Sequence, residues 1–198
     1  MKFLLLIAML FVLPNAAAQQ SDAKPEEWLC LMPCKSGLTA KVRRVSAVET
    51  RRAHQLNMIG FTSWELGFDK PTDILPVREG EVVDADPELQ RVVVRHEDGT
   101  LARYNLVDDI AVVNGQQLTL QTTIGRTSQV DAKTWAVGLE ILRIEPNPNL
   151  DERRSVNARY TNLEHYIDPV FRSSRGKHMF TDGGSYKSVR RKWFVFWI

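Results

Sequence analysis

Residues 77–113 read VREGEVVDADPELQRVVVRHEDGTLARYNLVDDIAVV, and this stretch decides the fold class. Two chain reversals divide it. Residues 84–88 interrupt an apolar run with turn-forming residues, and Asp98-Gly99 is a strong hairpin signal because glycine adopts positive φ freely. Between them, residues 91–96 are rich in β-branched side chains, which fit a half-buried pleated surface. The stretch predicts an antiparallel meander to which flanking strands are added.

The segments on both sides of the meander extend this pattern. Alternating or aromatic-rich stretches predict further strands at residues 61–68, 117–124, 133–144 and 186–189, the first of which also fits an aromatic-rich loop. Residues 39–58 fit one helix, or a strand at 40–48 followed by a short helix at 49–58. The second reading is favoured because the good helix formers lie in the later half.

A second helix is expected at residues 150–171, where Val156, Tyr160, Leu163 and Ile167 lie at helical spacing. Residues 125–131 are expected to form a loop. The predicted fold is therefore mainly β within the α+β class. It is an antiparallel meander in a small barrel-like or sandwich sheet, with one or two helices.

The first residues have the layout of a secretory signal peptide. Lys2 gives a positive start, residues 3–13 are apolar, and Ala16–Ala18 supply the small residues for cleavage between Ala18 and Gln19. The apolar run is shorter than the about 20 residues that span a bilayer, and no longer one follows. The sequence therefore predicts a periplasmic or secreted protein without a transmembrane segment in its mature chain. We expect a signal peptide at 1–18, a polar leader and cysteine-stapled arm at 19–38, and a single β-rich domain at 39–198.

The charge balance disfavours a nucleic-acid partner. Lys and Arg number 26 against 24 Asp and Glu, a formal net charge of +2. A strong polyanion binder should carry a much larger positive charge. The charge is uneven, however, with basic clusters at residues 43–44, 51–52, 153–154 and 190–192. The plain interpretation of these clusters is a solvated surface of mixed charge.

The two cysteines, Cys30 and Cys34, lie in the sequence CLMPC. An exported protein with an even number of cysteines favours a disulfide between them. Met32 lies between the two and adds a thioether to the two thiolates, which is a ligand set for Cu(I). This segment therefore predicts a Cys30–Cys34 disulfide, with periplasmic metal handling as an alternative. No metal site or other cofactor is otherwise predicted.

Catalytic motifs are missing from the sequence. It contains neither a GxSxG nucleophile motif nor a GxGxxG or GxxxxGK[ST] phosphate loop, and its histidines do not form HExxH. If the protein is an enzyme, the best catalytic candidates are His165 and Asp168, three residues apart on the expected helix, together with His178. An enzymatic role is therefore less favoured than a binding role.

The last residues, Trp193–Ile198, are apolar on both faces of an extended strand. Such a strand is buried on both faces, either within this domain's own sheet or in a partner. Trp193, Phe194, Phe196 and Trp197 are therefore the predicted binding residues. The leading hypothesis is an exported protein that acts by protein–protein contact, as an accessory of an envelope or secretion assembly or as an inhibitor-type partner. The alternative is a secreted hydrolase of envelope polymer or nucleic acid.

Overall fold

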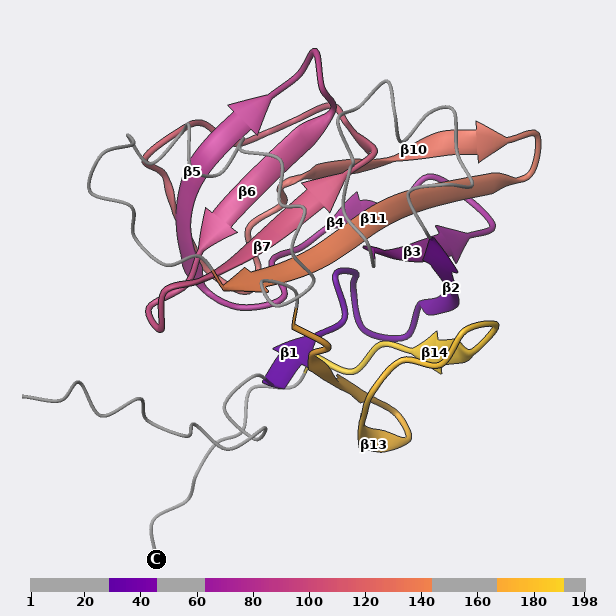
Figure 1. Ribbon diagram of the computed structural model, residues 1–198. Coiled ribbons are helices and arrows are strands. Elements are labelled where there is room, and N and C mark those ends of the chain that lie inside the picture. The colour runs from indigo at the N-terminus through magenta and orange to yellow at the C-terminus, as the bar shows by residue number, and fades with distance from the viewer. Residues whose placement is uncertain (1–28, 46–62, 144–166, 191–198) are drawn as a thin grey trace, which may run out of the picture.

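The described part of the chain is built from β-strands alone. The computed structural model describes residues 29–45, 63–143 and 167–190, and none of these is helical (Figure 1). The strands are β1 (Leu29–Leu31), β2 (Thr39–Val45), β3 (Ser63–Phe68), β4 (Asp73–Ile74), β5 (Gly80–Asp86), β6 (Arg91–Arg95), β7 (Thr100–Asn105), β8 (Val107–Asp108), β9 (Gln117–Leu118), β10 (Gly125–Asp131), β11 (Thr134–Arg143), β12 (Val170–Ser173), β13 (Gly176–His178) and β14 (Ser185–Lys187). The prediction of a mainly β protein with a large antiparallel sheet is confirmed. Within these ranges no helix is long and apolar enough to cross a membrane.

The predicted meander is formed by β5, β6 and β7, which pair in antiparallel order. Asp86 makes the first reversal, because its Oδ1 accepts hydrogen bonds from the backbone N–H groups of Glu88 and Leu89 at 3.1 and 3.0 Å. Gly99, at φ +77°, makes the second. Both reversals are therefore local features of the residues that predicted them.

The other long strands build onto the meander. The main sheet runs in the order β14-β2-β3-β11-β7-β6-β5-β9, and β10 pairs with β11, β4 and β8. The strand predicted at 133–144 is β11, which joins the meander to β3 (Figure 1). The long strand β11 therefore fixes the register of both halves of the sheet.

One face of the main sheet carries the main hydrophobic core, and the opposite face carries polar and charged residues beside a smaller hydrophobic cluster of Val93, Leu101 and Leu142. Alternate residues Trp64, Leu139, Tyr104 and Val92 form a row across β3, β11, β7 and β6, and all four belong to the hydrophobic core. Shifting each strand by one residue gives the opposite row, Glu65, Gly138, Asn105 and Arg91. We call the side of the sheet that carries this second row the polar face.

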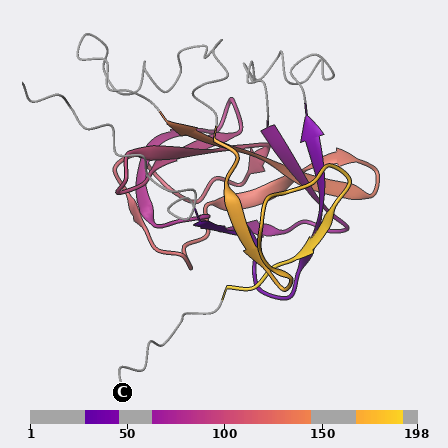
Figure 2. The ribbon, with the colours of Figure 1, turned by 60° about the horizontal axis from the view of Figure 1, so that its bottom comes forward.

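A small second sheet, β1-β12-β13, closes the core at one end. β1 pairs in parallel with β12, which places Cys30 opposite Phe171. Phe171 stacks on Phe180 at 3.8 Å between ring centroids, and Phe180 meets the ring edge of Trp64 at 5.8 Å. In Figure 2 the yellow segment 167–190 lies against the indigo segment 29–45, and β14 pairs with β2. The two ends of the described chain are thus packed together.

Arg190 connects several segments at this end of the molecule by hydrogen bonds. Its guanidinium donates hydrogen bonds to the backbone carbonyls of Met32, Pro76 and Leu120, with 2.7 Å to the Pro76 oxygen. Burial lowers the pKa of Arg190, and the group remains charged. One side chain therefore ties the N-terminal arm, the start of the meander and the loop after β9 to the C-terminal segment.

Three sequence expectations about elements are corrected. The helix expected at 150–171 lies mostly outside the described residues, but its last part is strand β12 from Val170 onward. The described residues therefore contain none of the one or two expected helices; the helix expected at 49–58 lies outside them. Residues 125–131 form strand β10 rather than a loop. The strand expected at 117–124 is only β9, because Thr119 and Thr122 form a turn.

Candidate functional site on the polar face of the main sheet

The predicted catalytic residues do not form a cluster in the described structure. His165 lies outside the described residues, and Asp168 is exposed just before β12. His178 lies in β13, opposite Phe171, and its ring contacts are with Tyr186 and Phe180 rather than with Asp168. The predicted binding residues Trp193, Phe194, Phe196 and Trp197 also lie outside the described residues.

The surroundings of His178 indicate a structural part in the β12–β13 hairpin. Its Nδ1 lies 3.2 Å from the Gly176 carbonyl oxygen and 3.5 Å from Ser173 Oγ, and its ring stacks on Tyr186 at 4.5 Å. Burial lowers its pKa. A general base activating Ser173 would need a distance of about 2.6–3.2 Å and a group that orients the imidazole. Ser173 Oγ instead accepts the Arg175 backbone N–H at 3.1 Å. Among the described residues, Ser173 and His178 therefore do not form a nucleophile–base pair.

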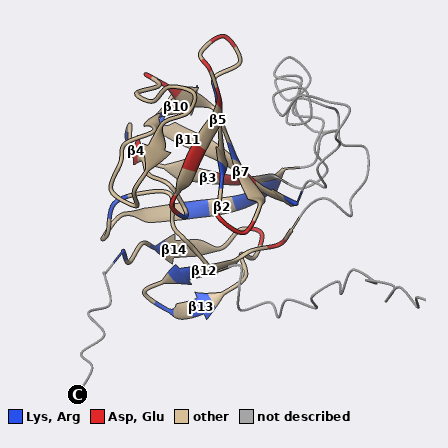
Figure 3. Ribbon diagram, turned by 90° about the vertical axis from the view of Figure 1, so that its left-hand side faces the viewer, with Lys and Arg blue, Asp and Glu red and all other residues tan. Residues whose placement is uncertain are grey.

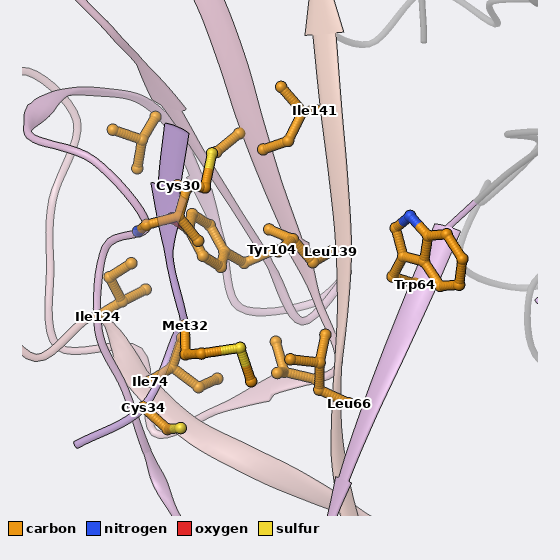
Figure 4. Packing of buried hydrophobic residues seen from close by; sticks show 14 of the residues in the cluster. Cys30, Met32, Cys34, Trp64, Leu66, Ile74, Tyr104, Ile124, Leu139 and Ile141 are labelled. Atoms are coloured by element: carbon orange, nitrogen blue, oxygen red, sulfur yellow. The ribbon is translucent and has the colours of Figure 1, made fainter. Parts of the chain in front are cut away.

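The predicted Cys30–Cys34 disulfide is not formed, and both cysteines are buried free thiols. Cys30 lies in strand β1, and Figure 4 shows Cys30 and Cys34 on either side of Met32 in the core. Strand β1 ends at Leu31, and Cys34 lies in the bend that follows it. Burial raises the pKa of Cys30 to about 12 and that of Cys34 to about 11. Burial therefore favours the protonated thiol at both positions in the metal-free protein. Among the described residues, no His, Cys, Asp and Glu side chains group as a metal site.

Two ion pairs are buried side by side on the polar face. Arg103 on β7 donates from Nη1 to Glu140 Oε2 on β11 at 2.9 Å. Arg91 on β6 donates from Nε and Nη2 to Asp84 Oδ2 on β5 at 3.1 and 2.6 Å. The carboxylates have no exposed surface. Isolated charges at such depth are very costly, so these pairs fix how the strands face one another.

The polar face is open at its other end. There, Arg43 on β2 pairs with Glu65 on β3 at 3.0 Å, and the Arg43 side chain is 61% exposed whereas Glu65 is 16% exposed. The next residue in the same row is Gly138, and the one after it is Asn105, which is 1% exposed. The face therefore passes from solvent at β2 to a buried region at β7.

Small residues occupy the middle of the polar face. Glu65 lies opposite Gly138, and the neighbouring pair is Gly67 and Ala136. Gly138 and Ala136 are both buried, and neither carries a long side chain over the sheet backbone. Asn105 lies on the far side of Gly138. The small residues thus separate the partly buried carboxylate of Glu65 from the buried amide of Asn105.

Two buried polar atoms beside Gly138 have no hydrogen-bond partner: Nδ2 of Asn105 and Oε1 of Glu140. Asn105 is directly opposite Gly138, and Glu140 is two residues further along β11, so the two side chains are diagonal neighbours about 7–8 Å apart. Burial raises the pKa of Glu140, and the charge of Arg103 opposes that rise. Each buried unpaired polar group costs about 1–3 kcal/mol. Asn105 and Glu140 therefore present one unused donor and one unused acceptor, and we take them as the candidate site.

The sequence predictions missed this site, although part of its signal is visible. Arg103 and Glu140 are charged residues within strands whose other positions are largely apolar. A charge in such a strand indicates a buried pair, but the sequence does not show which strands are neighbours. The cross-strand register that places Asn105 opposite Gly138 is seen only in the structure and could not be predicted from the sequence.

No protein family model and no curated protein matches the sequence. Its fold is similar to those in three solved structures: the SpoIIQ–SpoIIIAH pore-forming complex (19% identity, 58% of this chain and 83% of the other, TM-score 0.43), another crystal structure of SpoIIIAH and SpoIIQ (21%, 57% and 90%, 0.43), and the M23 metalloprotease pseudoalterin from the deep sea (9%, 82% and 96%, 0.49). All identities are below 25% and all TM-scores below 0.5, so we draw no functional conclusion from these similarities.

Proposed function

We propose that this chain is an exported envelope protein that acts by protein–protein contact, and that the polar face receives a segment of its partner. The supporting observation is the pair of unused polar atoms, Asn105 Nδ2 and Glu140 Oε1, next to Gly138. Buried polar groups in folded proteins are almost always hydrogen-bonded. A partner that supplies the missing hydrogen bonds would gain affinity at this position.

The chemistry of the two atoms favours a peptide segment as the ligand. A peptide group carries one acceptor, its carbonyl oxygen, and one donor, its N–H. The carbonyl can accept from Asn105 Nδ2 while the N–H donates to Glu140 Oε1. Gly138 between them has no side chain to hold the peptide away from the sheet. An extended segment entering from the exposed Arg43 end would follow the row of small residues to this point.

The burial of Asn105 has a kinetic consequence. At 1% exposure, its amide is not accessible in the unbound molecule, so the polar face has to open before a partner reaches it. Association that requires a conformational change is slower than the about 10⁵–10⁷ M⁻¹s⁻¹ typical of rigid docking. Slow association would therefore accompany binding at this site.

The test compares three forms of the protein as bait in an envelope fraction of its own cells: wild type, Asn105→Ala and Asn114→Ala. Asn114 is an exposed asparagine in a turn and serves as the matched control. We expect at least one protein to be retained by wild type and Asn114→Ala and lost by Asn105→Ala, as measured by quantitative mass spectrometry. Identical retention by all three forms would contradict the proposal. Thermal unfolding of Asn105→Ala must remain cooperative, with an unchanged or higher Tm, because the variant removes an unpaired buried donor.

A further inference from the structure

Charge is strongly divided between two parts of the described chain. We call strands β1, β2, β12, β13 and β14, with their connections in residues 29–45 and 167–190, the basic lobe. Its charged residues are Lys35, Lys41, Arg43, Arg44, Arg172, Arg175, Lys177, Lys187 and Arg190, against only Asp168 and Asp182. In residues 63–143, Asp and Glu outnumber Lys and Arg. Although the formal net charge of the whole chain is only +2, the described part has a positive end and a negative body (Figure 3).

Several cations of the basic lobe face solvent without a carboxylate. Lys35 pairs with Asp73 and Arg43 with Glu65. By contrast, Lys41, Arg175, Lys177 and Lys187 are exposed, and none of them forms an ion pair with any described residue. These four are the available positive charges of the lobe.

The available charges lie along one connected strip. Lys187 is opposite Thr39, and Lys41 follows two residues along β2 on the same exposed side. The Ser174 backbone N–H donates to the Lys187 carbonyl at 2.9 Å, which places the β12–β13 turn with Arg175 beside β14. Lys177 continues the strip along β13, and in Figure 3 the ribbons of β2, β12 and β13 carry blue Lys and Arg positions at the same end of the molecule.

Lys177 lies directly opposite Arg172 in the β12–β13 hairpin, so two basic residues are cross-strand neighbours there. A concentration of positive charge of this kind is consistent with binding an anionic surface.

We propose that the basic lobe docks the protein on a membrane surface that carries anionic lipid headgroups. Lysine is depleted at protein–protein interfaces, whereas clusters of Lys and Arg bind anionic leaflets. Met179, two residues after Lys177, is 53% exposed and is one of two exposed large hydrophobic residues in the described part of the chain, and apolar groups beside basic ones suit the headgroup boundary. In the sequence, Arg191 and Lys192 follow Arg190 directly. The acidic body is repelled by the same surface, so docking has one orientation.

The test measures binding of the full mature chain to vesicles by co-sedimentation. We expect binding to mixed phosphatidylglycerol–phosphatidylcholine vesicles, little binding to phosphatidylcholine alone, and loss of binding as NaCl rises from about 0.05 M to about 0.3 M. Each Lys near an anionic leaflet strengthens binding about fivefold, so Lys177→Glu/Lys187→Glu should weaken it by about thirtyfold or more. The control is Lys133→Glu, an exposed lysine between β10 and β11 that is not part of the basic lobe, which should bind like wild type.

Three results would overturn the proposal. These are equal binding to charged and neutral vesicles, equal binding by the lobe variant and the Lys133→Glu control, or salt-sensitive binding to polyglutamate with none to vesicles, which would identify an acidic protein as the partner. If the lobe variant lacks a cooperative thermal transition, Lys177→Gln/Lys187→Gln replaces it, with an expected weakening of about thirtyfold.

Discussion

Replacing Glu140 by leucine should be among the most destabilising single changes in the described part of the chain. The substitution removes the carboxylate that accepts the 2.9 Å hydrogen bond from Arg103 and leaves the guanidinium facing an apolar side chain in a buried position. Removing one partner of a buried ion pair typically costs about 3–5 kcal/mol. In a chain of this size about 1 kcal/mol shifts Tm by roughly 2–4 °C, so Tm should fall by roughly 6–20 °C.

The assay is a double-mutant cycle followed by urea unfolding and circular dichroism. The double variant Arg103→Met/Glu140→Leu should recover part of the lost stability, because it no longer buries an unmatched charge. The matched control is Glu65→Leu, whose partner Arg43 is 61% exposed and stays solvated, and it should cost no more than about 1 kcal/mol. If Glu140→Leu costs as little as Glu65→Leu, the charges are not buried together and the account of the polar face is wrong.

The pH dependence of the same residue gives a second readout. Burial raises the pKa of Glu140 in the folded protein above its value in the unfolded chain. The folded state therefore holds this proton more tightly, and the resulting stability is fully present below about pH 4.3 and is lost as pH rises through the folded pKa. Wild type should lose stability relative to non-titrating Glu140→Gln over that interval. A constant difference between the two proteins would show that the pKa of Glu140 is not raised.

Three further predictions concern other parts of the chain. Burial lowers the pKa of His96, so stability should fall as pH drops below about 6.5, and His96→Gln should lose less stability between pH 7 and 5 than wild type. Cys30 and Cys34 should resist iodoacetamide in the native protein and both be alkylated in urea; a mass without free thiols would restore the predicted disulfide. Deleting Trp193–Ile198 should abolish the cooperative thermal transition if this strand completes the domain's own sheet, whereas an unchanged Tm would identify it as a partner-binding segment.

The meander was predictable because its signals are local. The turn at Asp98-Gly99 needs only a glycine at positive φ, and the alternation of β11 from Trp135 to Ile141 determines which residues face the core. By contrast, strand β10 has the polar sequence GRTSQVD and is held by backbone pairing with β11, β4 and β8. The sequence of β10 lacks the regular alternation of apolar and polar side chains that predicts a strand. The strands with which β10 pairs are distant from it in sequence. The polar face could not be predicted for the same reason, because its residues come from strands that are far apart in the chain.

The cysteine prediction failed for a related reason. An oxidising compartment and an even number of cysteines make a Cys30–Cys34 disulfide chemically possible. The bond also needs a turn that brings the two sulfurs together. Of the residues between the two cysteines, Leu31 is the last residue of β1 and pairs with β12, and Met32 packs into the core. The chain bends at Pro33 and Cys34 only after the strand has ended, so Cys30 is held in the sheet and Cys34 lies beyond it.

The two proposed surfaces meet on β2, and this has a consequence for where a partner would be found. Lys41 belongs to the basic strip, whereas Arg43, two residues along the same exposed side, begins the row that leads through Glu65 to Asn105. A molecule docked through the basic lobe would hold the open end of the polar face beside the membrane. A partner that depends on Asn105 should then be one whose contacting segment lies close to the bilayer. Such a partner should be captured less well by Lys177→Glu/Lys187→Glu from intact membranes but equally well from detergent extract. Equal loss in both preparations would mean that the lobe contacts the partner itself.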